Sequence, residues 1–309
     1  MNVIITGGAG FIGSNLCDLL LKEGHKVVIV DNLSTGHKSN ILPFIDEIQF
    51  FREDVESFDF NKIINIDAVV HLAAQPSVPL SIENFSSSSS SNLLGAINVI
   101  DCCRIRHVPM IYASSSAIYG DLLLGNDESN EVDLLSPYSV DKYAIELYAK
   151  VAYKLYQLSS VGLRFFNVYG PKQDPGSPYS GVISVFADRI LDSQDINING
   201  GHQTRDFVYV KDVVNIIHRA IILASKNTVC ETSNVLTGKS ITVDCLSDQM
   251  MDVIGVNVGK NYQDLPVGDP EQSDGTVGKM SRLFSIKTKN FSKLKEGLVE
   301  TIQHIKADK

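Results

Sequence analysis

Tyr138 and Lys142 are the two residues of this 309-residue chain whose types and spacing point most directly to chemistry. They stand four positions apart at the start of a segment with helical periodicity, so both side chains lie on one face of the predicted helix. An ammonium beside a phenol favours the phenolate and lowers its pKa from about 10, which makes the tyrosine usable as an acid and base. The same spacing also joins ordinary pairs on helix surfaces, so a second signal is needed.

That second signal is a run of three serines, residues 114–116, about 22 positions before Tyr138. The run follows a predicted strand over residues 109–113, and ligands of open parallel sheets bind at the carboxyl ends of the strands. A serine hydroxyl there can bridge a substrate oxygen and the phenol. His71 ends another predicted strand, where it is either a packed core histidine or a base.

A glycine-rich turn at residues 6–13 predicts a cofactor site. Gly8, Gly10 and Gly13 satisfy the pattern G-x-G-x-x-G between an apolar strand and a predicted helix, although glycines alone also suit a plain connection. Such a turn brings backbone close to a pyrophosphate and directs free helical N–H groups at it. Asp31 ends the next apolar strand, 18 positions after Gly13, where a carboxylate accepts both ribose hydroxyls and repels a 2′-phosphate. The pattern therefore favours NAD over NADP.

The elements that position these residues alternate between strand and helix as far as residue 166, which predicts an α/β fold with a doubly wound parallel sheet. The predicted strands lie at residues 3–5, 27–30, 48–51, 67–74, 109–113 and 161–166, and a long predicted helix covers 137–158. The serine run 86–91 is interpreted as a loop and the entry of a helix, not as a linker. Further elements are predicted at 182–191, 207–210, 229–234, 243–254 and 291–305. We expect residues 1–166, with returning segments at about 205–235, to form a Rossmann domain, and 167–204 and 236–309 a smaller lobe.

Composition narrows the classes of partner. The chain carries 36 acidic and 27 basic residues, a net charge of −9, and has no Lys/Arg-rich run, which argues against nucleic acid and anionic membranes. Five cysteines without paired zinc-ligand spacing favour a reduced compartment and no metal. The apolar runs fall short of the roughly 18 residues of a membrane span, and the N-terminus lacks a basic leader, so we expect a cytoplasmic protein.

The ordered set of motifs resembles the extended short-chain dehydrogenase/reductases and, among them, the nucleotide-sugar epimerases. The resemblance covers nearly the whole chain and is carried by residues 6–13, Asp31-Asn32, Asp54-Val55, residues 71–74, Asn92-x-x-Gly95, residues 114–120, Tyr138-x-x-x-Lys142, and residues 164–171 and 205–212. It implies an NAD-binding Rossmann domain and a smaller C-terminal α/β lobe that binds a nucleotide sugar. Relatives commonly form homodimers by pairing the helix after Asn92 with the helix that carries Tyr138, so a homodimer is expected.

The resemblance also implies roles for individual residues. Tyr138 is implied as the base, Lys142 as a group that also holds the nicotinamide ribose, and Ser116 as the serine that orients the sugar hydroxyl. The implied NAD-binding residues are Gly7, Gly10, Phe11, Ile12, Gly13, Asp31, Asn32, Asp54, Val55, Leu72, Ala73, Ala74, Ser114, Tyr138 and Lys142. The implied substrate-binding residues are Ser116, Asn167, Val182, Arg205 and Ser273. For Arg205, a salt bridge with Asp206 is the alternative to a bond with diphosphate.

Two local features indicate which reaction the resemblance implies. Similar 4,6-dehydratases carry an Asp-Glu pair after the catalytic Ser/Thr, where this chain has Ala117 and Ile118, so elimination of water is not expected. The implied reaction is inversion at C4 of a UDP-sugar through a 4-keto intermediate. A small Ser273 leaves room for an N-acetyl group, which favours UDP-N-acetylglucosamine and UDP-N-acetylgalactosamine, with the plain hexoses also open. UDP-glucuronate or another nucleotide sugar, and a non-catalytic NAD-binding relative, are the alternatives.

The chain departs from the family pattern at three places that concern the nucleotide. Residues 264–267 lack the usual arginine before the Gly268-Asp269 segment, and Gly275-Thr276 replaces the usual Ala-Asp. Asn199 stands where many relatives have an aromatic residue against the uracil. These departures leave the identity of the nucleotide open, and they do not involve Tyr138 or Lys142.

Overall fold

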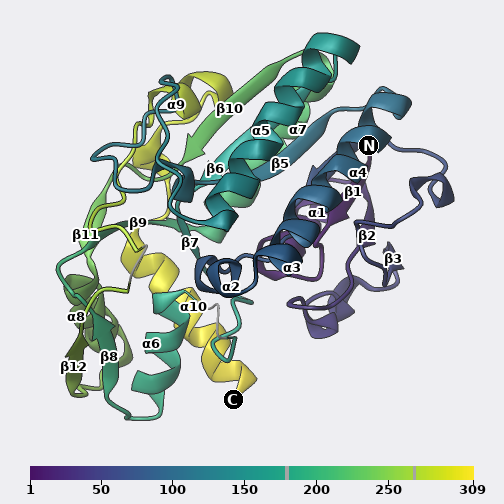
Figure 1. The fold of residues 1–309 in the computed structure, drawn as a ribbon. Coiled ribbons are helices and arrows are strands. Elements are labelled where there is room, and N and C mark those ends of the chain that lie inside the picture. Colours follow the sequence, from purple (N-terminus) through teal and green to yellow (C-terminus); the bar gives the residue numbers. More distant parts are fainter. Residues whose placement is uncertain (178–180, 267–268) are drawn as a thin grey trace. The chain divides into compact units, whose positions relative to one another are not determined.

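The computed structural model describes residues 1–177, 181–266 and 269–309 (Figure 1). It contains two compact units, each assembled from separate stretches of sequence. The first unit contains Met1–Ile118, Leu134–Arg164 and Val214–Ser233, and the second contains Tyr119–Asp133, Phe165–Val213 and Asn234–Lys309. Val267 and Gly268, singled out above, lie outside the described residues.

A seven-stranded sheet forms the centre of the first unit, in the order β10-β6-β5-β4-β1-β2-β3. Its strands are β1 Asn2–Thr6, β2 Lys26–Val30, β3 Ile48–Phe51, β4 Ala68–His71, β5 Met110–Ser115, β6 Ser160–Phe165 and β10 Cys230–Val235. The five strands from β3 to β5 pair in parallel, with Ile4 opposite both Val28 and Val69. Apart from β10 at the edge, the order is that of a doubly wound dinucleotide-binding sheet. The predicted fold class is confirmed.

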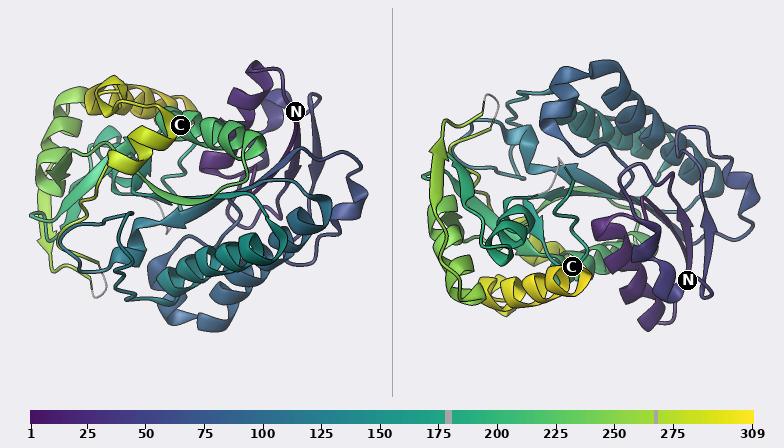
Figure 2. Two further views of the ribbon diagram at one scale, coloured as in Figure 1. Left: turned by 90° about the horizontal axis from the view of Figure 1, so that it is seen from above. Right: turned by 90° about the horizontal axis from the view of Figure 1, so that it is seen from below.

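Helices cover both faces of this sheet (Figure 2). Helices α1 (Phe11–Lys22) and α7 (Val210–Lys226) lie on one face, and α4 (Gly95–Arg106) and α5 (Pro137–Tyr156) lie on the other. The inner strands are continuous apolar runs because neither face meets water; Ile4, Val69 and Ile111 are fully buried. Helix α5 begins as the sequence predicts: Ser136 and Ser139 bond reciprocally in a capping box, and Pro137 occupies the first turn.

The serine run 86–91 is helical, so its interpretation as a loop was wrong. It spans α3 (Phe85–Ser89), which follows α2 (Val78–Glu83), and continues into a π-helical turn, Ser90–Leu94. Serine has a low intrinsic propensity for the interior of a helix. Buried contacts nevertheless stabilise the helical conformation of this segment. The Asn92 side-chain oxygen accepts a hydrogen bond from the backbone N–H of Gln75 at 2.8 Å, and its amide donates to the Gln75 carbonyl at 3.2 Å.

The second unit contains two small sheets with helices. The three-stranded sheet has the order β11-β9-β7 and the two-stranded sheet the order β12-β8. The strands are β7 Asn167–Tyr169, β8 Ile196–Asn199, β9 Thr204–Tyr209, β11 Ser240–Thr242 and β12 Lys260–Gln263, and the helices are α6 Val182–Leu191, α8 Val243–Ile254, α9 Gly278–Phe284 and α10 Leu294–Asp308. Helix α8 ends where Gly255 adopts φ +78°, a left-handed conformation that suits glycine.

In the described part of the chain, every helix is either too short or too polar to span a lipid bilayer.

Gly162 tests the packing of the sheet in the first unit. A Cβ at Gly162 would lie 2.6 Å from the phenol end of Tyr112, which is 1% exposed and has little room to move. We expect Gly162→Ala to lower the free energy of unfolding by about 1–3 kcal/mol, as overpacking of a close-packed core does. Gly278→Ala, where a Cβ meets no described atom within 4 Å, is the matched control. Equal urea midpoints for the two variants would contradict this account.

Candidate active site

The turn after β1 has a backbone that only glycine allows. Gly7 adopts φ +72°, and a Cβ on it would lie 2.6 Å from the backbone nitrogen of Ala73. A Cβ on Gly13 would collide with the Gly7 carbonyl oxygen. Gly10 differs, because among the described residues its Cβ would approach only that carbonyl oxygen, at 3.2 Å. Gly10 also caps α1 without a side-chain bond, so open space lies next to free helical N–H groups, as a pyrophosphate requires.

Asp31 is fixed at the carboxyl end of β2, beside the same turn. Its Oδ2 accepts a hydrogen bond from the Ala9 N–H at 2.9 Å, and its Oδ1 accepts one from the Leu33 N–H at 2.8 Å. Burial raises the pKa of this carboxyl, and the backbone N–H bonds oppose that shift. An ionised carboxylate has about four acceptor sites, and the backbone N–H groups of Ala9, Gly10 and Leu33 occupy three of them, so one remains for a ribose hydroxyl. The turn and the carboxylate therefore fit a dinucleotide.

The other predicted cofactor residues surround the same sheet edge. Phe11 and Ile12 form the first turn of α1. The Asn32 amide donates to the Asp54 carboxylate at 2.6 Å, and Val55 packs into the core at 9% exposure. Leu72, Ala73 and Ala74 directly follow β4. The Leu72 N–H donates to the Thr6 carbonyl at 3.0 Å, which holds this segment against the end of β1.

Tyr138 and Lys142 pack against the end of β5. The Ser115 side chain interacts with the Tyr138 phenol and lowers its pKa, and the Lys142 Nζ lies 5.7 Å from the centre of the phenol ring. Lys142 donates to the Ala113 carbonyl at 3.0 Å. Burial lowers the pKa of Lys142 to about 8, and the nearby Asp141 carboxylate opposes that shift. The structure thus brings a phenol, a hydroxyl and a buried amine together at one sheet edge.

The predicted direction of the Tyr138 pKa was wrong. Burial raises the pKa of the phenol above its ordinary value, and the bond with Ser115 only partly offsets this. The ammonium of Lys142 is directed to the Ala113 carbonyl, so it does not lower the phenol pKa in the way that the spacing suggested. An i, i+4 spacing places two side chains on one face, but it does not decide where a flexible lysine directs its charge.

The serine beside Tyr138 is Ser115, whereas the sequence favoured Ser116. Strand β5 continues through Ser115, two residues beyond its predicted end, and Ser116 begins a 3-10 turn, Ser116–Tyr119. Ser114 donates its hydroxyl to Glu146 at 2.6 Å, as expected for neighbours that alternate across a strand, so its side chain does not face the phenol. The residues after Ser115 are Ser116 and Ala117, neither of them a carboxylate, so the argument against a dehydratase remains.

His71 is a packed histidine at the end of β4. Its Nδ1 lies 2.8 Å from the Thr6 hydroxyl, and the side chain is 1% exposed. Burial, with a further contribution from the Lys142 charge, lowers its pKa to about 3. The ring is therefore neutral near pH 7, which supports the packing role over the role of a base.

The predicted substrate residues belong to the second unit, except Ser116. Asn167 opens β7, whose parallel partner β9 carries Arg205, and Val182 opens α6. Ser273 is partly buried before α9. The Arg205 guanidinium donates to the Thr204 carbonyl at 2.8 Å and pairs with the Asp269 carboxylate.

The alternative partner proposed for Arg205, Asp206, was wrong. The Asp206 carboxylate is fully buried and accepts hydrogen bonds from the backbone N–H groups of Thr237 and Lys239 at 2.8 and 2.9 Å. Adjacent strand residues point to opposite sides, which separates it from Arg205. Two of the positions that differ from the family pattern are also placed. The Thr276 hydroxyl donates to the Asp127 carboxylate at 2.9 Å, and Asn199 is the last residue of β8.

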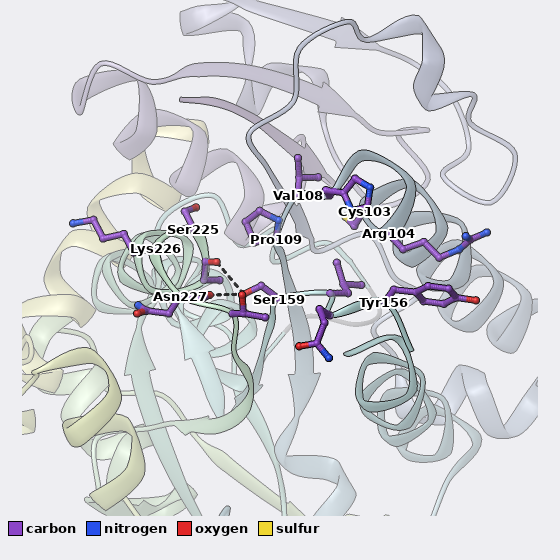
Figure 3. A pocket seen from close by; sticks show the side chains of 14 residues that line it. Cys103, Arg104, Val108, Pro109, Tyr156, Ser159, Ser225, Lys226 and Asn227 are labelled. Atoms are coloured by element: carbon purple, nitrogen blue, oxygen red, sulfur yellow. Dashed lines mark hydrogen bonds between the residues drawn. The ribbon is translucent and has the colours of Figure 1, made fainter. Parts of the chain in front are cut away.

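A pocket of about 240 Å³ lies at the opposite edge of the large sheet, near the amino ends of β5, β6 and β10 (Figure 3). Its wall includes Ser159, whose hydroxyl donates to the carbonyls of Ala224 and Asn227, both at 2.9 Å. Arg104 and Lys226 extend in opposite directions in Figure 3, and the Arg104 guanidinium lies over the Tyr156 ring. Ligands of open α/β sheets bind at the carboxyl edge, so this pocket is separate from the candidate site.

The neutral, buried His71 predicts a loss of stability in acid. Its folded pKa of about 3 lies below the ordinary value of 6.5, so the unfolded chain binds the extra proton first, and stability falls as the pH drops from about 6.5 toward 3. We expect a contribution of up to about 1.4 kcal/mol per pH unit, measured by urea unfolding. His71→Gln removes this slope, whereas His202→Gln at an exposed position keeps it. Identical slopes in both variants would refute the assignment.

Comparison with known proteins shows that this chain is similar to a family of NAD-dependent enzymes. The model of the NAD dependent epimerase/dehydratase family matches residues 3–235. A putative UDP-glucose 4-epimerase of Methanocaldococcus jannaschii is 40% identical over 271 residues, which cover 85% of this chain and 86% of that protein.

Two solved structures have the same fold over essentially their whole length. A UDP-N-acetylglucosamine 4-epimerase from Methanobrevibacter ruminantium, in complex with UDP-N-acetylmuramic acid, has a TM-score of 0.92 and 35% identity and covers 100% of this chain and 99% of its own. A UDP-glucuronic acid 4-epimerase from Bacillus cereus, in complex with UDP-glucuronic acid and NAD, has a TM-score of 0.91 and 29% identity and covers 100% of both chains. The predicted resemblance and the NAD cofactor are confirmed, and the chain belongs to the NAD dependent epimerase/dehydratase family.

Proposed function

We propose that the chain is an isomerase that inverts C4 of a UDP-sugar with bound NAD, with no net oxidation or reduction. The observation that carries this proposal is the contact of the Tyr138 phenol with Ser115 at the carboxyl end of β5. The glycine turn and Asp31 follow β1 and β2 of the same sheet, at the same edge. A proton acceptor and a dinucleotide cradle that share one edge are what oxidation of a sugar alcohol requires.

In this proposal, some residues of the first unit bind the cofactor and others take part in proton transfer. Gly10 and Asp31 would hold the dinucleotide, which when bound would supply reversible hydride chemistry at C4 of the sugar. Tyr138 accepts the proton of the 4-hydroxyl and later returns it to the 4-keto sugar. Ser115 holds the reacting oxygen against the phenol, and Lys142 would hold the nicotinamide ribose, as the family resemblance implies.

For the sugar, we propose UDP-N-acetylglucosamine and UDP-N-acetylgalactosamine, with the plain hexoses also accepted. A serine at position 273 leaves more space than a bulky side chain, and the Methanobrevibacter relative carries the N-acetylated sugar in its name. In the second unit, the forked guanidinium of Arg205 suits a diphosphate, which replaces its ion pair with Asp269. The Bacillus cereus relative favours UDP-glucuronate as the second candidate.

A panel of UDP-sugars tests the substrate. Incubation with the N-acetylhexosamine, hexose and hexuronate forms, followed by chromatographic separation of C4 epimers, is expected to convert the N-acetylated pair with the highest kcat/KM. Conversion of UDP-glucuronate alone would refute the N-acetylhexosamine assignment and identify UDP-glucuronate as the substrate. Bound NAD without turnover of any UDP- or dTDP-sugar would support a non-catalytic binding protein.

Variants of the tyrosine and the two serines test the catalytic assignments. We expect Tyr138→Phe to lower kcat by about 10²- to 10⁴-fold and to retain NAD, since a general base contributes about this much. Ser115→Ala is expected to lower kcat much more than Ser116→Ala, because Ser115 interacts with the phenol. A larger loss in Ser116→Ala would restore the assignment made from sequence.

We also propose that the protein works as a homodimer. Helices α4 and α5 lie side by side (Figure 1), and they expose large apolar side chains, namely Ile105, Leu147, Tyr148, Val151, Leu155 and Tyr156. A patch of this kind typically marks an interface. Pairing of these two helices with the same helices of a second copy covers the patch.

Sedimentation velocity tests the dimer. Val151→Lys places a charge on the patch at a position 51% exposed, where it costs the monomer little, and we expect it to convert a dimer to monomers. Ile222→Lys, on α7 on the other face of the sheet, is the control and should leave the dimer intact. A wild-type protein that sediments as a monomer at micromolar concentration would refute the proposal.

A further inference from the structure

Glu146 is a buried carboxylate one helical turn beyond Lys142. Tyr138, Lys142 and Glu146 are each four residues apart, so they share the face of α5 that packs against β5. The side chain of Glu146 is 0% exposed. Because an unpaired charge at this depth is very costly, its partners decide what it does.

Two residues hold Glu146 by both carboxylate oxygens. On β6, Arg164 donates from Nε to Oε1 at 2.8 Å and from Nη2 to Oε2 at 2.7 Å, and its side chain is 6% exposed. Ser114, on the neighbouring strand β5, donates its hydroxyl to the same Oε1 at 2.6 Å. The bidentate bond fixes the plane of the carboxylate, and that plane fixes where the Ser114 hydroxyl must lie.

Three consecutive residues at the end of β5 are thereby tied to one face of α5. The Ala113 carbonyl accepts from Lys142, Ser114 donates to Glu146, and Ser115 bonds the Tyr138 phenol. Ser114 and Ser115 are consecutive residues of β5. Holding the Ser114 hydroxyl therefore fixes the last residue of the strand, and with it the direction of the Ser115 hydroxyl.

We propose that Glu146, held by Arg164, is a positioning residue: through Ser114 it sets the place of the Ser115 hydroxyl against Tyr138. The inference rests on the function proposed above, and it gives the Ser114 side chain a role other than contact with NAD. A buried ion pair alone does not indicate a functional role, because desolvation offsets much of its attraction. Here the third bond, to Ser114, connects the pair to the site.

Ser114→Ala tests this tie, because it removes one hydroxyl and leaves the Glu146–Arg164 pair in place. We expect kcat to fall about tenfold, as small misplacements of a reacting group do, with KM for the UDP-sugar and NAD content unchanged. Ser114→Thr keeps the hydroxyl on a residue suited to a strand, and it should restore kcat. Glu146→Gln, which weakens the bond to Arg164, should lower kcat to a similar extent.

A measurement without turnover separates this inference from the proposed function. The pKa of Tyr138, followed by ¹³Cζ-tyrosine NMR and assigned with Tyr138→Phe, should rise in Ser114→Ala because the Ser115 bond that lowers it is weakened. That variant keeps the side chains of Lys142 and Asp141 on α5, His71 on β4 and Tyr112 on β5, and it keeps the Glu146–Arg164 ion pair. If the wild-type protein is inactive but the Tyr138 pKa still rises in Ser114→Ala, the proposed function is refuted and the positioning role of Glu146 is retained.

Ser247→Ala is the matched control in the second unit. Ser247 is fully buried and donates to the Asp244 carbonyl at 2.7 Å, so the variant loses a comparable hydrogen bond far from β5 in sequence. We expect it to lower the melting temperature without changing kcat or the Tyr138 signal. The proposal is overturned if Ser114→Ala changes only stability, as Ser247→Ala does, or if its loss of activity follows loss of NAD.

Discussion

The constraint on which the first unit depends is the close approach of three backbone segments at the end of β1. Gly7 contacts the backbone of Ala73, Gly13 contacts the Gly7 carbonyl, and a Cβ on Gly36 would lie 2.9 Å from the backbone of Ala9. Asp31 closes the arrangement through its bond to Ala9. All of these contacts join residues of the protein itself, so packing fixes the shape of the dinucleotide cradle.

The second half of the site depends on how α5 lies against β5. Buried charges make this register specific: the Lys142 ammonium and the Glu146 carboxylate can each be satisfied only opposite particular residues of β5 and β6. A shift of α5 by one turn would leave both charges unpaired in the core, at a cost far above that of an apolar mismatch. Polar contacts thus select one alignment, while the apolar core stabilises many similar ones.

The sequence predicted the fold because the strands of a covered parallel sheet are apolar runs, and the glycine turn and α6 occupy their predicted positions. It failed where tertiary contacts override local preference. Buried bonds at Asn92 stabilise the helical serine run, and the two further residues of β5 place Ser115 beside Tyr138. The direction of the Tyr138 pKa and the Arg205–Asp269 pair depend on long-range contacts that residue spacing does not encode. Glu146 belonged to no motif that indicates a role, and the 164–171 motif gave Arg164 no role of its own.

The edge strand β10 has a consequence for how the protein is made. The large sheet is completed by Cys230–Val235, more than a hundred residues after β5 and beyond much of the second unit in sequence. During synthesis, β6 therefore leaves the ribosome with one edge unpaired and stays so until β10 follows. Such an exposed edge is a template for pairing with other chains. Aggregation during expression is accordingly expected to be sensitive to mutations in β6 and β10, even where the folded protein is stable.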